Sequence, residues 1–255
     1  MERLDMLGAS VEVLSLGSGR PMLFLHAEEA FEQNLPFLER LAKQHRVIAP
    51  RHPGFGGSAL PPEFRTVADL ALLYLDLLDK LELKEPVLVG SSFGGWIATE
   101  MCVCSPERIA RLVLIGSLGV KLGGREDRDF ADIYFMPHEE LRGRLYADPE
   151  RWSPDYSKLS EADLQVAGRE RQSMAFFGWR PYMHNPLLRR WLHRVRMPTL
   201  LVWGEQDGFV SPAYAKNLAA ALPKAELRTI AKAGHFPQIE QLEETVGVIE
   251  SFIRS

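Results

Sequence analysis

Short apolar runs bounded by glycine or proline recur along this 255-residue chain and alternate with segments of helical spacing. Several of the runs are typical of fully buried strands, because they form short continuous apolar stretches. Strands that alternate with amphipathic helices predict an α/β fold with a mostly parallel sheet and helices on both of its faces. The predicted strands are residues 11–16, 22–26, 46–50, 86–90, 111–116, 199–204 and 225–230, and the clearest predicted helices are 67–81, 93–103 and 211–222.

One stretch, residues 122–194, breaks this alternation. It has no strong strand signal and is rich in Arg, Trp, Met, Tyr, His and Pro. We interpret it as a helical cap, or lid, inserted after the strand that ends near Gly116. The core domain is then built from residues 1–121 and 195–255.

The charge balance argues against several kinds of partner. A net charge of −4 with 25% charged residues gives no reason to expect nucleic acid or an anionic membrane as a partner. The start of the chain lacks the apolar stretch of a secretory signal, and the leucine-rich run 70–81 is too short and too charged to span a bilayer. We expect a cytoplasmic protein that acts on a small molecule, and the sequence does not indicate its oligomeric state.

Residues 89–95, VGSSFGG, place two serines between glycines where a predicted strand meets a predicted helix. The pattern Gly-x-Ser-x-Gly fits only Ser92, since it runs from Gly90 to Gly94. A sharp turn from strand to helix strains the central residue and presents its hydroxyl at the carboxyl end of the sheet. Small residues at such a turn can also be purely structural, but the strand before and the helix after favour a nucleophile at Ser92.

A serine hydroxyl becomes a good nucleophile when a base takes its proton and a third group orients the base. His235 lies in a loop between the last predicted strand and the final helix, and Asp207 lies just past the strand 199–204. Glu205 is the rival acid. The order Ser92, Asp207, His235 is the one that the α/β-hydrolase fold uses, so we predict these three as a catalytic triad. The predicted chemistry requires no metal or other cofactor.

With these residues and the segments RHPGFGGS, WGEQD and GHFPQIEQ, the chain resembles the α/β-hydrolase superfamily. Within it, the chain is similar to cap-bearing bacterial esterases and meta-cleavage C–C hydrolases. The resemblance implies an oxyanion hole made by the backbone N–H groups of Glu28 and Phe93. Two positions depart from the family pattern: Ala27 replaces a glycine next to that hole, and Arg51 replaces an aspartate that relatives commonly have.

Glu28, Glu29 and Glu32 form an acidic cluster close to this predicted oxyanion hole. Carboxylates suit the start of a solvated helix, which is one interpretation. The other is that they exclude anionic substrates, in which case neutral esters would react faster than negatively charged ones.

Together these features predict a serine hydrolase that cleaves a small to medium, apolar carboxylic ester through an acyl-enzyme on Ser92. The cap segment 174–186 is rich in aromatic residues and methionine, which predicts a pocket wall, although helical spacing also fits core packing. The predicted substrate-binding residues are Trp96, Phe177, Trp179, Met183 and Phe236.

Two alternative functions stay open. The first is a C–C hydrolase of the meta-cleavage type, in which an arginine reaches in from the cap. Arg189 and Arg190 are available for that role, but Phe236 follows the predicted base where that group typically has tryptophan. The second is a receptor-like protein that binds a ligand and retains the triad, because fold alone does not fix function.

Overall fold

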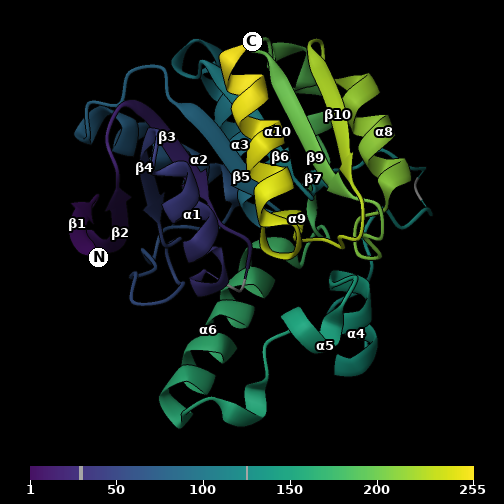
Figure 1. Ribbon diagram of the computed structural model, residues 1–255. Coiled ribbons are helices and arrows are strands. Elements are labelled where there is room, and N and C mark those ends of the chain that lie inside the picture. Colours follow the sequence, from purple (N-terminus) through teal and green to yellow (C-terminus); the bar gives the residue numbers. More distant parts are fainter. Residues whose placement is uncertain (29–30, 125) are drawn as a thin grey trace.

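A computed structural model of the chain describes residues 1–28, 31–124 and 126–255. Its centre is an eight-stranded sheet in the order β1-β2-β4-β3-β5-β6-β9-β10 (Figure 1). Strand β2 runs antiparallel to β1 and β4, and the other neighbours are parallel. The strands are β1 Glu2–Met6, β2 Ala9–Leu16, β3 Arg20–Leu25, β4 His45–Pro50, β5 Val87–Ser91, β6 Arg111–Ile115, β9 Thr199–Gly204 and β10 Ala225–Ile230.

The predicted α/β fold with a mostly parallel sheet is confirmed, and the seven predicted strands all lie in this sheet. The eighth strand, β1, was not predicted. It pairs at the edge of the sheet, and Met6 is its one buried residue. An edge strand with so little apolar surface lacks the alternation that identifies a strand in a sequence.

Helices cover both faces of the sheet, and each face has its own apolar core (Figure 1). Helices α1 (Leu35–Leu41) and α10 (Leu242–Arg254) pack on one face. Helices α2 (Val67–Lys80), α3 (Phe93–Cys104) and α8 (Pro212–Ala221) pack on the other. The sheet is therefore buried on both sides, which is why its central strands are continuous apolar runs.

Between β6 and β9 the chain leaves the sheet, and Figure 1 shows α4, α5 and α6 beyond its lower end. We call residues 122–194 the cap; that it forms a separate domain stays a prediction. Two short strands, β7 (Gly119–Val120) and β8 (His184–Asn185), pair in parallel where the chain leaves and re-enters the core. A ladder of two residues is too short to show a periodicity, so it could not be predicted. The cap helices are α4 His138–Leu145, α5 Pro149–Trp152, α6 Glu161–Gly178 and α7 Leu188–Trp191.

The remaining elements are short. Helix α9 (Pro237–Glu240) follows the loop that carries His235. Across the ranges that the structure describes, no helix has the length and apolar character needed to cross a membrane. The 3₁₀ turns are η1 Glu32–Asn34, η2 Pro106–Arg108, η3 Tyr156–Lys158 and η4 Leu192–Arg194.

Candidate active site

Ser92 occupies the turn between β5 and α3, with φ 50° and ψ −113°. Such a backbone is strained for a residue with a side chain and persists only where the surroundings enforce it. The flanking glycines explain how the turn fits. A Cβ on Gly90 would lie 2.5 Å from the carbonyl oxygen of Gly94, and one on Gly94 would lie 2.0 Å from that of Leu25. The Gly-x-Ser-x-Gly pattern therefore meets a steric demand of a sharp strand-to-helix turn.

The side chains of Ser92, His235 and Asp207 form one hydrogen-bonded chain. His235 Nε2 lies 2.9 Å from Ser92 Oγ, and His235 Nδ1 lies 2.8 Å from Asp207 Oδ2. The other Asp207 oxygen, Oδ1, accepts hydrogen bonds from the backbone N–H groups of Phe209 and Val210. All three side chains are buried. A carboxylate fixed by two backbone donors holds the imidazole so that Nε2 faces the hydroxyl.

The loop that carries His235 is attached to the cap. The backbone N–H of His235 donates to the carbonyl oxygen of Leu145, at the end of α4, with a distance of 2.7 Å. The carboxylate of Glu240 accepts from the N–H of Gly234 at 2.7 Å and from that of Ala147 at 2.8 Å. Burial raises the pKa of Glu240, and these backbone donors act in the opposite direction. Sequence reasoning missed Glu240, because its role depends on contacts with a distant segment.

Glu205, the rival acid, and Ser91, the second serine, do not take part in the hydrogen-bonded chain of Ser92, His235 and Asp207. Glu205 is exposed, one turn away from the buried Asp207. Ser91 is the last residue of β5, and its hydroxyl accepts a hydrogen bond from Gln238 Nε2 at 3.1 Å. Of the two serines in VGSSFGG, Ser92 is the one next to an imidazole.

Glu28 is buried, and its Oε2 lies 3.3 Å from Ser92 Oγ, further than His235 Nε2 at 2.9 Å. Ala27 is fully buried and is not among the residues with positive φ, so alanine in place of glycine imposes no left-handed strain there. The N–H of Phe93 is the first of α3 and has no acceptor within its own helix. The assignment of these two backbone N–H groups, Glu28 and Phe93, to an oxyanion hole stays a prediction.

The predicted acidic cluster is divided. Glu28 contacts Ser92 instead of solvent, whereas the Glu32 side chain is 66% exposed and pairs with Arg51. Glu29 lies outside the described residues. The interpretation as solvent-exposed carboxylates at the start of a helix therefore does not apply to Glu28.

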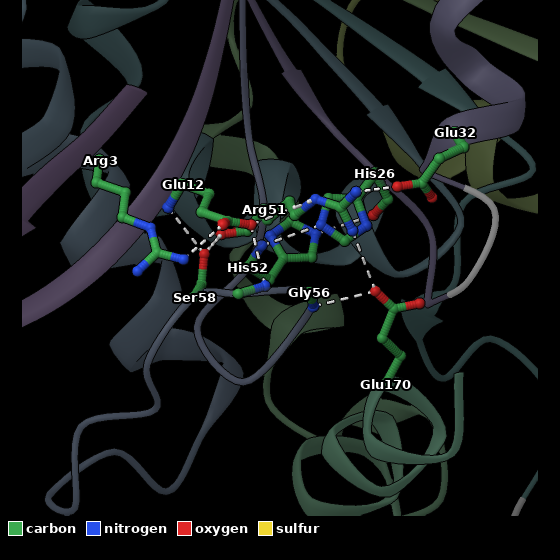
Figure 2. A network of polar contacts seen from close by, with 10 residues as sticks. Arg3, Glu12, His26, Glu32, Arg51, His52, Gly56, Ser58 and Glu170 are labelled. Atoms are coloured by element: carbon green, nitrogen blue, oxygen red, sulfur yellow. Dashed lines mark hydrogen bonds and ion pairs between the residues drawn. The ribbon is translucent and has the colours of Figure 1, made fainter. Parts of the chain in front are cut away.

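Arg51, which replaces the aspartate common in relatives, joins four parts of the molecule (Figure 2). Its guanidinium lies 3.7 Å from Glu12 of β2 and 3.4 Å from Glu170 of α6, contacts Glu32, and stacks over the Phe31 ring. Glu170 also accepts from the N–H of Gly56. Arg51 thus has carboxylate partners on three other segments. Its contact with Glu170 connects α6 of the cap to the loop after β4.

The family follows from comparison with known proteins. The sequence profile described as alpha/beta hydrolase fold matches residues 20–242. The chain belongs to this family. This α/β-hydrolase is 29% identical over 254 residues to the 2-hydroxymuconate semialdehyde hydrolase of Pseudomonas sp. (strain CF600), with 93% of this chain and 88% of the relative covered.

Solved structures of similar hydrolases agree with the fold. A membrane phospholipase A, described as a bacterial virulence factor, superimposes with a TM-score of 0.84 at 22% identity and covers 99% of this chain and 85% of its own. Est816, described as an N-acyl homoserine lactone degrading enzyme, has a TM-score of 0.73 at 25% identity, with 98% of this chain and all of its own (100%) covered.

The hydrolase has a cavity of about 40 Å³ next to Glu28, between the core and the cap. Ser92 and His235 are not among the described residues that line it, whereas Glu28 and Phe236 are. A cavity of this volume has room for a few water molecules. The described lining is Glu28, Ile133, Tyr134, His138, Leu141, Arg142, Leu145, Tyr146, Ser153, Pro154, Tyr156, Arg171, Met174 and Phe236.

Of the five predicted substrate-binding residues, Phe236 lines this cavity, and its ring lies 4.8 Å from that of His235. Trp96, Phe177 and Met183 are buried in the apolar core instead. Trp179 is 58% exposed and lines a separate hollow on the surface. These four residues therefore lie outside this cavity, because helical spacing brings apolar side chains together without showing whether the contact is a pocket or a core. Their role in substrate binding stays a prediction.

The cap arginines that the sequence offers for C–C cleavage also lie outside this cavity. Arg189 and Arg190 are exposed, and Arg189 donates to the carbonyl oxygen of Leu122. The arginines that line the cavity are Arg142 of α4 and Arg171 of α6. Arg171 donates to the carbonyl oxygen of Ile133 at 2.7 Å.

Proposed function

We propose that this hydrolase cleaves a small to medium carboxylic ester through an acyl-enzyme on Ser92. The observation that carries the proposal is the hydrogen-bonded chain from Ser92 through His235 to Asp207, built on a strained turn at the carboxyl end of β5. The similarity to Est816 supports an ester, since a lactone is a cyclic ester.

In the proposed reaction, Ser92 Oγ attacks the ester carbonyl carbon while His235 Nε2 takes its proton. The imidazolium then gives that proton to the departing alcohol. Asp207 stabilises the charged ring and keeps its tautomer. Water repeats the attack on the acyl-enzyme and releases the acid and free Ser92.

The tetrahedral intermediate carries a negative oxygen, which needs preorganised donors. The backbone N–H groups of Glu28 and Phe93 are our candidates, and removing one such donor costs about 3 kcal/mol in comparable enzymes. Phe93 is well suited, because the amino terminus of α3 also favours negative charge.

A second candidate is C–C bond hydrolysis. The 29% identical relative acts, by its name, on a muconate semialdehyde, which carries a carboxylate. Arg142 and Arg171 in the cavity lining place positive charge where a distant carboxylate of the substrate could lie, although Arg142 also pairs with Glu139 and Glu150. Glu28 next to Ser92 disfavours any carboxylate close to the reacting carbon, so we rank this reaction second.

Labelling with a fluorophosphonate probe and hydrolysis of a short-chain p-nitrophenyl ester test the proposal together. We expect the wild type to react with both. Ser92→Ala should abolish labelling and reduce hydrolysis about 10⁶-fold, the scale seen when a catalytic serine is removed.

Ser91→Ala is the matched control, because it removes the neighbouring buried hydroxyl without touching the imidazole. It should keep both signals. Labelling that persists in Ser92→Ala would refute the assignment. An inert wild type that binds ligands tightly would favour the receptor-like alternative.

A further inference from the structure

Glu28 is an acidic side chain that contacts both Ser92 and the cavity. Its carboxylate contacts Ser92 Oγ at 3.3 Å, and the same residue lines the cavity. Ser92 itself is fully buried and is not part of the described lining. An acyl group bonded to Ser92 Oγ would therefore lie next to this carboxylate.

The sheet order shows which part of a substrate Glu28 faces. Glu28 follows β3, which neighbours β5 on one side, whereas His235 follows β10 on the side of β6 and β9. The leaving group departs next to His235, which protonates it. Glu28 thus approaches the nucleophile from the opposite side, where the carbonyl and the acyl chain lie.

A carboxylate at this position works against an ordinary acyl transfer. The transition state places negative charge on the carbonyl oxygen, and like charges repel strongly where water is excluded. A protonated amine on the acyl chain would pair with Glu28 and offset this repulsion. A carboxylate on the acyl chain would add a third negative group to the same place.

We propose that Glu28 selects the acyl group: it favours acyl chains with a protonated amine close to the scissile carbonyl and disfavours those with a carboxylate there. This inference rests on the proposed role of Ser92 and narrows its substrate class to amino-acyl esters. Leu141 of α4 and Met174 of α6 contribute apolar lining to the same cavity from the cap.

Three methyl esters of matched length test the inference: those of butyric acid, of β-alanine, and the monomethyl ester of succinic acid. They place a methyl, an ammonium and a carboxylate at the same distance from the carbonyl. We expect kcat/KM, measured from released methanol, to fall at least about tenfold at each step from the ammonium to the methyl to the carboxylate.

Glu28→Gln should bring the three values together, whereas Glu28→Asp, which keeps the charge, should keep their order. Both variants retain the backbone N–H. Glu140→Gln is the control, since it removes an exposed carboxylate of α4 that pairs with Arg144. It should leave the preference unchanged.

Equal kcat/KM for the three esters in the wild type, or a preference that survives Glu28→Gln, would overturn the inference and leave the role of Ser92 intact. Failure to hydrolyse any of the three, combined with no labelling of Ser92, would overturn the proposed function and this inference with it.

Discussion

Two fully buried histidines lie close to the Ser92 turn, and their partners differ. His235 Nδ1 faces the Asp207 carboxylate, and its Nε2 faces a hydroxyl. His52 Nδ1 accepts from the Tyr74 hydroxyl at 2.6 Å, and its Nε2 donates to the carbonyl oxygen of His26 at 2.9 Å. The His52 ring also stacks on His26, with centroids 3.8 Å apart.

These partners decide what each ring can do. A carboxylate stabilises an imidazolium, so His235 can take a proton and hold it. His52 and His26 have no carboxylate partner in the described contacts. Burial lowers the pKa of His52 to about 4 and that of His26 well below its usual value, the latter with a further contribution from His52. Both rings are neutral, and the hydrogen bonds and stacking between the two histidines hold the segment after β3 against the loop after β4.

Apart from Ser92→Ala, the largest effect on the His235 centre is expected from Asp207→Asn. The amide leaves the side-chain shape intact but favours the wrong imidazole tautomer, so we expect kcat to fall about 10⁴-fold. The measurement is steady-state hydrolysis of the p-nitrophenyl ester. Glu205→Gln changes the exposed rival acid and should stay within about twofold of the wild type. A large loss in Glu205→Gln with activity kept in Asp207→Asn would reverse the assignment.

The second prediction concerns the His52 pair and the pH dependence of stability. An unfolded histidine binds a proton below about pH 6.5, whereas folded His52 stays neutral until about pH 4. The unfolded state therefore gains protons first as the pH falls, and stability is lost between these values. The difference between the folded and unfolded pKa of His52 lowers the free energy of unfolding by about 3 kcal/mol once the pH reaches 4. His26 acts in the same direction.

Urea unfolding at several pH values between 7 and 4 measures this loss. His52→Gln should unfold more readily at pH 7 and show a smaller decrease in the free energy of unfolding toward pH 4. A wild-type stability that stays constant across this range would contradict the neutral pair.

The contrast between the two centres also shows what a sequence can supply. Ser92 and Asp207 follow β5 and β9, whose apolar runs are fully buried, and the motif around Ser92 reflects local sterics at Gly90 and Gly94. Such local demands leave a pattern in the chain. The core strands and the three residues that meet at the site could therefore be predicted.

The cap contacts leave no such pattern. Helix α6 buries Glu170 and Ser173 together with Met174 and Phe177. Glu170 pairs with Arg51, and Ser173 bonds the carbonyl oxygen of Gly54, so polar residues form part of its buried face. Hydrophobic spacing cannot identify that face. Four of the five predicted pocket residues lie elsewhere for this reason.

The smallest expected effect in the comparison of His235 with His52 comes from Tyr74→Phe. It removes the hydroxyl that donates to His52 Nδ1 and leaves a buried acceptor without that donor, which we expect to cost about 1–2 kcal/mol of unfolding free energy. Hydrolysis by the folded variant should be unchanged, because His52 has a structural role and takes no part in the proposed reaction. Tyr214→Phe removes another buried hydroxyl, bonded to the carbonyl oxygen of Val120, and calibrates the cost of losing one such bond. If Tyr74→Phe instead lowered kcat far more than Tyr214→Phe at equal stability, His52 would belong to the reacting centre and the division between the two histidines would fail.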